Sequence, residues 1–151
     1  TDNGQPRILP YACLVPFATG TLKGASKAWP GFPTLCRQLV PELPVLLMPG
    51  PGPETIQART DYPDAQTLAG VPLDVYAALL AHSAVVVAND TGPGHLAAAV
   101  GARLVSVLGP TDASRYRALG PHVTLIQHHP WPEVDTVLQQ VHQAIAAARQ
   151  G

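Results

Sequence analysis

The regular alternation of short apolar runs with helical patterns is the feature that most constrains the fold of this 151-residue chain. Strands are expected at the apolar runs, which are Ala12–Phe17, Val45–Met48, Ala65–Leu68, Val85–Ala88, Leu104–Leu108 and Val123–Ile126. Helices are expected at Phe32–Leu39, Glu54–Thr60, Leu73–Ala81, Leu96–Val100 and Val134–Arg149. Strands that are apolar on both faces and alternate with helices predict a Rossmann-like α/β fold, a parallel sheet of about six strands with helices on both faces.

One domain is predicted for residues 11–151, because 46% of the residues are hydrophobic and the length suits one packed core. Residues 1–10 have the composition of a linker or of the remnant of a preceding domain. The net charge of −1 offers no basic surface to a nucleic acid, and no apolar run approaches the roughly 20 residues of a membrane span. Cys13 and Cys36 lack metal-ligand spacing, so we interpret them as buried small hydrophobic residues in a reducing, cytoplasmic compartment.

The segment from Val85 to Ala99 predicts a ligand site where a buried strand leads into a helix. Thr91 can cap that helix, and the free N–H groups of its first turn suit a phosphate. Asp90 would repel a phosphate but can accept hydrogen bonds from the hydroxyls of an attached sugar. A sugar phosphate therefore suits both the N–H groups of the helix and the carboxylate of Asp90. Two alternatives remain open. Asp90 and Thr91 can serve only as caps, and Asp-Thr-Gly also occurs in aspartic proteases, although those are all-β proteins.

Other strand exits also carry polar residues, and open α/β sheets bind ligands at the carboxyl ends of their strands. The loop Thr19–Pro30 contains two lysines and could wrap a diphosphate, with Pro30 opening a helix; exposed lysines can also be merely solvated. Glu54 could hold ribose hydroxyls or only stabilise the start of a helix. Thr111 could donate to a phosphate or sugar oxygen, and His95 could donate to a phosphate or simply pack in the core.

Four segments together resemble the ADP-heptose:lipopolysaccharide heptosyltransferase family. They are Lys27-Ala28-Trp29-Pro30, the Pro- and Gly-rich loop that ends at Glu54, the run from Asn89 to Ala99, and Gly109-Pro110-Thr111-Asp112. The resemblance implies the C-terminal, donor-binding half of a glycosyltransferase B fold that transfers heptose with inversion and needs no obligatory metal or other cofactor. It implies that Lys27 neutralises the donor diphosphate, that Glu54 holds the adenosine ribose, and that Asp90, Thr91 and Gly92 hold the heptose and adjacent phosphate. His95 matches the family's histidine in the following helix.

The same resemblance implies the partners of the chain. These are an ADP-sugar donor and, through an N-terminal domain without a counterpart in these residues, a lipid-linked saccharide acceptor in lipopolysaccharide core assembly. That domain would carry the catalytic base, so this chain is expected to bind donor without turnover. Membrane association would be at most peripheral, at the cytoplasmic face of the inner membrane. The alternatives are a non-catalytic sugar-nucleotide-binding module and a sugar-nucleotide epimerase or hydrolase domain.

Overall fold

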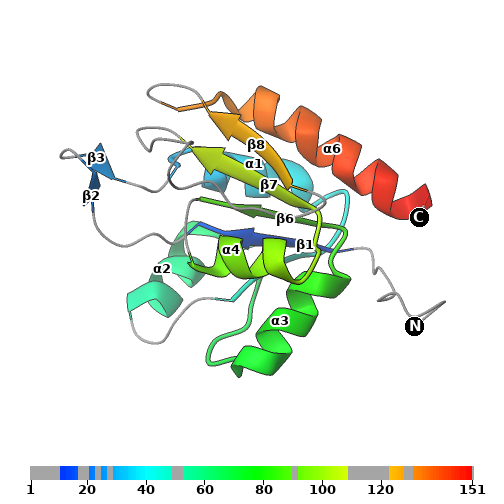
Figure 1. The fold of residues 1–151 in the computed structure, drawn as a ribbon. Helices are drawn as coiled ribbons and strands as arrows, with labels where there is room; N and C mark the ends of the chain where they lie inside the picture. The colour runs from blue at the N-terminus through cyan, green and yellow to red at the C-terminus, as the bar shows by residue number, and fades with distance from the viewer. Residues whose placement is uncertain are drawn as a thin grey trace.

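A six-stranded sheet in which all strands run parallel forms the centre of the molecule (Figure 1). The computed structural model describes residues 11–16, 21–22, 25–26, 29–48, 53–89, 92–108, 123–127 and 131–150. The sheet strands are β1 (Ala12–Val15), β4 (Val45–Leu47), β5 (Gln66–Thr67), β6 (Val85–Ala88), β7 (Leu104–Leu108) and β8 (Val123–Gln127). The predicted fold class is confirmed.

The strand order is β5-β4-β1-β6-β7-β8. The first three strands therefore lie on one side in the order β1, β4, β5, and the next three continue from the other side of β1 in the order β6, β7, β8. Dinucleotide-binding folds have this strand order. β1 and β6 pair in register, with Val15 opposite Ala88 at their carboxyl ends. The winding direction reverses between these two strands, and ligands of open α/β sheets bind at that switch point.

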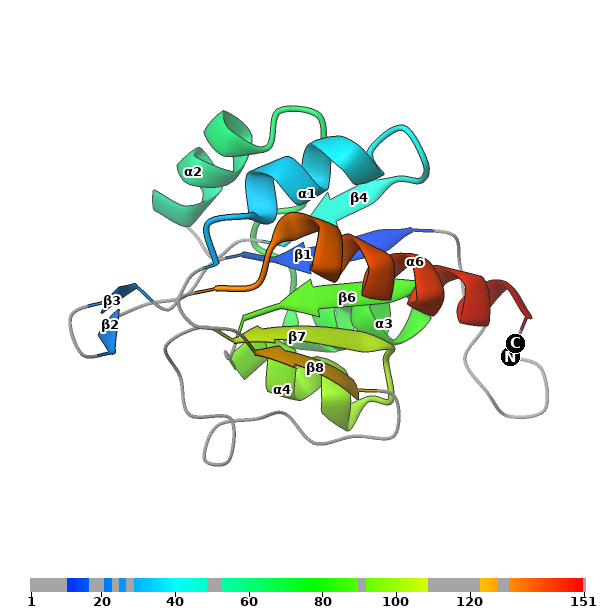
Figure 2. The same ribbon diagram turned by 90° about the horizontal axis from the view of Figure 1, so that it is seen from above.

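Helices cover both faces of the sheet (Figures 1 and 2). One face packs against α1 (Phe32–Leu39), α2 (Pro53–Asp61) and α6 (Val134–Gln150), and the other against α3 (Leu73–His82) and α4 (Gly92–Ala99). Side chains alternate along each strand, because successive residues of a strand point to opposite faces. Ala12 and Leu14 accordingly belong to the core on the α1 side, whereas Cys13 and Val15 belong to the core on the α4 side.

The turn after α4 shows how the sequence ends a helix and begins the next strand. Gly101 has a φ of 79°, a left-handed conformation that suits glycine. Its N–H donates to Ala98 O at 3.1 Å, and the N–H of Ala102 donates to Ala97 O at 3.0 Å. These two bonds satisfy carbonyls that the helix end leaves free, as in a Schellman motif. The chain then reverses into β7.

Several predicted boundaries differ from the observed ones. The segment before Trp29 contains a short antiparallel hairpin that was not predicted. Its strands, β2 (Thr21–Leu22) and β3 (Ala25–Ser26), have two residues each. Pro30 does not open the following helix; α1 begins at Phe32 and Pro33 lies in its first turn, where the missing N–H costs no helical bond. The edge strand β5 is also shorter than predicted. No helix in the described ranges combines the length and apolar character needed to cross a bilayer.

Candidate functional site

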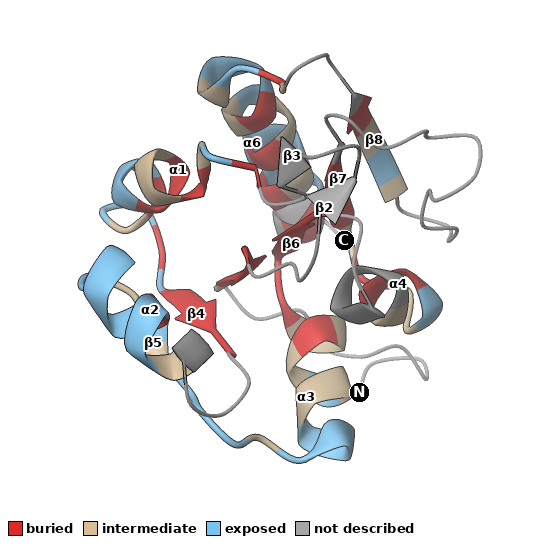
Figure 3. Cartoon of the chain, turned by 90° about the vertical axis from the view of Figure 1, so that its left-hand side faces the viewer, coloured by how far each residue is buried: buried red, intermediate tan, exposed pale blue. Residues whose placement is uncertain are grey.

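The carboxyl ends of β1 and β6 lie side by side at the switch point, and Figure 3 looks onto this edge of the sheet. Pro16 follows β1 and Asn89 follows β6, and both are buried. Three residues separate β6 from α4, so the N-terminus of α4 begins close to the same edge. The free N–H groups and positive dipole end of a helix at this position favour an anion.

Asn89 joins the two strand ends through its buried side chain, which is only 1% exposed. Its Oδ1 accepts a hydrogen bond from the main-chain N–H of Trp29 at 2.9 Å. Its Nδ2 donates to the carbonyl oxygen of Pro16 at 3.3 Å. Because one partner can only donate and the other can only accept, the orientation of the amide is fixed. Asn89 lies within the Val85–Ala99 segment, but no role was predicted for it from the sequence.

Trp29 continues this connection to the segment that leads into α6. Its indole N–H donates to Pro132 O at 3.0 Å, just before α6. Its ring, which is 3% exposed, packs edge-to-face on Phe32 with ring centroids 5.1 Å apart. Gly31 leaves room for the indole, since a Cβ there would lie 2.5 Å from Trp29 Cε2. The segments leading into α1 and α6 are thereby fixed to each other at the carboxyl edge.

The predicted ligand-binding side chains are not among those that the structure describes. Lys27, Asp90, Thr91 and Thr111 lie outside the described residues. The main chain of three others is described: Glu54 is the second residue of α2, and Gly92 and His95 are the first and fourth residues of α4. These two helices start after β4 and β6 on opposite faces of the sheet (Figure 3). The ligand roles of all seven residues stay predictions.

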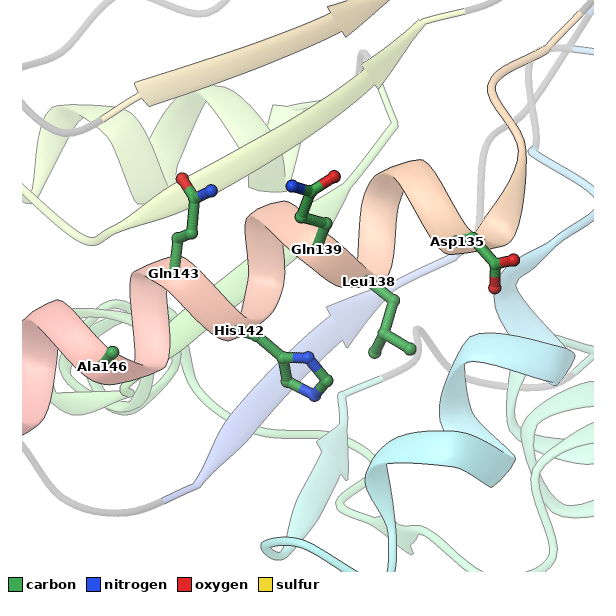
Figure 4. A pocket seen from close by; sticks show the side chains of 6 residues that line it. All are labelled: Asp135, Leu138, Gln139, His142, Gln143 and Ala146. Atoms are coloured by element: carbon green, nitrogen blue, oxygen red, sulfur yellow. The ribbon is translucent and has the colours of Figure 1, made fainter.

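A hollow of about 510 Å³ lies on the outer side of α6, away from the switch point (Figure 4). All of its lining side chains come from that one helix: Asp135, Leu138, Gln139, His142, Gln143 and Ala146. In Figure 4, Leu138 and His142 point to one side of the helix and Gln139 and Gln143 to the other. His142 Nε2 contacts Glu42 Oε2, outside the helix, at 3.0 Å, and both side chains are about half exposed. These groups diverge, so they do not form a binding site.

Both cysteines are buried, as predicted, and both are free thiols. They belong to the cores on opposite faces of the sheet, so they cannot form a disulfide with each other in this fold. Burial raises the pKa of Cys13 to about 12 and that of Cys36 to about 11. The thiols are therefore protonated at neutral pH and are poor nucleophiles. Within the described ranges, no three His, Cys, Asp or Glu side chains are grouped as metal ligands.

The fold and the site define the class of protein. A parallel sheet in this strand order, with a helix N-terminus beside the switch point, is a Rossmann-like domain of the nucleotide-binding type. The sequence model of glycosyltransferase family 9 (heptosyltransferase) matches residues 2–145. The chain belongs to this heptosyltransferase family.

Solved heptosyltransferase structures have the same fold. E. coli heptosyltransferase WaaC with ADP matches with a TM-score of 0.79 and 22% identity, over 93% of this chain and 45% of that one. E. coli ADP-heptose lps heptosyltransferase II matches with a TM-score of 0.73 and 23% identity, over 98% of this chain and 49% of that one. E. coli WaaC with ADP-2-deoxy-2-fluoro heptose matches with a TM-score of 0.69 and 25% identity, over 97% and 46% of the two chains.

The chain spans less than half the length of these solved structures. No curated protein sequence gives a significant match to it. The comparisons therefore establish the family and the fold, and the match to WaaC with ADP shows that a relative of this fold takes an adenine nucleotide.

Proposed function

We propose that this chain is the donor-binding half of an inverting heptosyltransferase and that its donor is ADP-heptose. The observation that carries the proposal is the position of the switch point between β1 and β6. The segments that follow these two strands carry Lys27 and Asp90 in the sequence. A diphosphate sugar bound there would meet a cation from one segment and a hydrogen-bond acceptor from the other. The family membership and the match to WaaC with ADP support the same donor.

The residues would divide the donor between them. Lys27 would neutralise the diphosphate, Glu54 at the start of α2 would hold the ribose hydroxyls, and Asp90, Thr91 and Gly92 would hold the heptose and the adjacent phosphate. Thr111 would donate to a phosphate or sugar oxygen, and His95, in the first turn of α4, to a phosphate. Three of these residues lie in the first turns of helices: Glu54 in α2, and Gly92 and His95 in α4. These helices follow β4 and β6, the strands on either side of β1.

The chemistry follows from the charge on the leaving group. As the bond between heptose and ADP breaks, negative charge builds on the diphosphate and the sugar becomes oxocarbenium-like. A lysine and the N–H groups at the start of α4 would stabilise that charge more in the transition state than in the ground state. The acceptor, a lipid-linked saccharide, and the general base that removes its proton would be held by a second domain. The chain alone would then bind donor and leave it intact.

Calorimetric titration of the chain with ADP-heptose, ADP and a UDP-sugar tests this proposal. We expect a preference for the adenine ligands. Lys27→Ala and Asp90→Ala should each weaken donor binding by about 1–3 kcal/mol, or roughly 5- to 150-fold, as for lost charged hydrogen bonds. Lys23→Ala is the matched control, because Lys23 belongs to the same loop but is assigned no ligand. Equal affinity for all nucleotides, or equal losses in Lys27→Ala and Lys23→Ala, would contradict the assignment.

A further inference from the structure

Two buried side chains, Asn89 and Trp29, connect the main chain at the carboxyl edge of the sheet. Together with the carbonyl groups of Pro16 and Pro132 we call them the buried clasp. Its three hydrogen bonds run from Asn89 to the segments at Trp29 and Pro16, and from Trp29 to the segment at Pro132. Each of these bonds ends on a main-chain group. The buried clasp therefore fixes the course of the chain after β1, after β6 and before α6.

The polar amide has no packing advantage at this position. Asn89 follows four apolar residues of β6 and is as buried as they are. A buried amide is unfavourable unless its donor and acceptor are both paired, and leucine, whose side chain has the same number and branching of heavy atoms, would avoid that cost. Both groups of Asn89 are paired, and both partners are main-chain atoms. The amide is therefore suited to holding two backbone segments at a set separation.

The sequence neighbours of the buried clasp are the residues of the proposed donor site. Asn89 directly precedes Asp90, and the Trp29 N–H that bonds to Asn89 lies two residues after Lys27. The 2.9 Å bond between them is thus a direct connection between the two segments. Groups that bind one ligand from different segments must be placed to within about half an ångström to act together.

We propose that Asn89 and Trp29 are positioning residues, which set the separation of the Lys27 and Asp90 segments to match the diphosphate and sugar of one donor. The inference rests on the proposed function, and it extends the donor site to two residues that touch no ligand. The proposed role concerns the diphosphate and sugar of the donor and not its adenosine. Recognition of the adenosine part, which Glu54 would serve from the exit of β4, involves no residue of the buried clasp.

The Asn89→Leu variant tests the claim with little change in shape and no added charge. Its side chain can neither accept from the Trp29 N–H nor donate to Pro16 O, and, unlike a carboxylate, it does not repel the phosphates of ADP. We expect the affinity for ADP, measured by calorimetry, to fall at least 10-fold. The affinity for adenosine, followed by NMR titration, should stay within about twofold. Loss of folded protein would lower both affinities together.

Ser83→Ala is the matched control. Ser83 is also buried and also bonds a main-chain carbonyl, Leu80 O at 2.7 Å, but it lies before β6 at the opposite edge of the sheet. This variant should keep the wild-type ratio of ADP to adenosine affinity. If Asn89→Leu does not fold, Trp29→Phe decides, because it removes the indole bond to Pro132 together with part of the ring and keeps the main-chain N–H that bonds to Asn89.

Three outcomes separate the two proposals. A selective loss of ADP affinity in the clasp variants supports the positioning role. The second outcome is that the wild-type chain binds ADP, but the variants keep both the ADP and the adenosine affinity or lose both by the same factor. That outcome overturns the positioning role and leaves the donor site standing. A wild-type chain with no affinity for ADP refutes the proposed function, and the positioning role is refuted with it.

Discussion

The tight contact between Gly31 and Trp29 predicts that a single methyl group at position 31 disturbs the buried clasp. Gly31 caps the N-terminus of α1 with a φ of −83°, which any residue can adopt, so a Gly31→Ala variant has no backbone strain. Its Cβ would, however, lie 2.5 Å from Cε2 and 3.0 Å from Cη2 of Trp29, and closer still to Cζ2. The indole cannot easily move away, since it is buried, bonded to Pro132 and packed against Phe32.

The expected magnitude combines three effects. Overpacking a well-filled core costs about 1–3 kcal/mol, and a weakened indole bond adds up to about 1 kcal/mol. The lower entropy of an alanine in the unfolded chain offsets about 0.4–1 kcal/mol of this. Taken near the middle of each range, these effects give a net loss of about 2 kcal/mol in the free energy of unfolding, so we expect a value of about 1–3 kcal/mol. For a domain of this size, about 3 °C per kcal/mol then lowers the Tm by about 3–9 °C.

Thermal and urea unfolding, followed by circular dichroism, measure this loss, and a double-mutant cycle assigns it. In a Trp29→Phe background the ring atoms Cζ2 and Cη2 are gone, so Gly31→Ala should cost at least about 1 kcal/mol less than in the wild type. A Tm of Gly31→Ala within about 1 °C of the wild type would contradict the predicted overpacking. An equal loss of stability in both backgrounds would show that the indole ring is not the group that the new methyl contacts.

Two further predictions concern residues outside the buried clasp. Since burial raises the pKa of Cys13 to about 12 and of Cys36 to about 11, their thiolate fractions at pH 8 should be on the order of 1 in 10⁴ and 1 in 10³. Both thiols should resist a thiol-specific reagent in the folded chain and react fully in guanidinium, whereas rapid labelling of the folded chain would contradict their burial. Glu42→Gln should change the free energy of unfolding by less than about 1 kcal/mol, because the contact of Glu42 with His142 is exposed to solvent. A larger loss of free energy in urea unfolding would contradict this and show that the contact stabilises the fold.

The central strands were the most predictable part of the fold. Val85–Ala88 and Leu104–Leu108 were predicted with the bounds that the structure shows, because both are short, rich in valine and bounded by polar or turn-forming residues. The edge strand β5 was predicted too long, since a run such as Ala65–Leu68 does not show where pairing with a single neighbour ends. The β2–β3 hairpin was missed, because strands of two residues are too short to produce any alternation.

The sheet edge at which a ligand site is expected was predictable, but the contacts that Asn89 and Trp29 make there were not. Parallel topology alone places all strand exits at one edge, and the polar residues after β6 indicated which exit to examine. The roles of Asn89 and Trp29 depend on contacts between residues 60 positions apart in the chain, and on a bond from Trp29 to Pro132 that spans 103 positions. No local pattern encodes such contacts.

The alternation of β6 nevertheless contains a signal for the role of Asn89. Val85 and Val87 face the core on the α1 side, and Val86 and Ala88 face the core on the α4 side. The same period of two, continued by one residue, turns Asn89 back toward α1, and there it meets Trp29. A polar residue that continues the inward alternation of a buried strand must find partners inside the protein, because an unpaired amide there would be costly. In strand-exit motifs of this kind, the residue that continues the buried pattern is therefore the first candidate for a scaffold role, and ligand contacts are better sought among its neighbours.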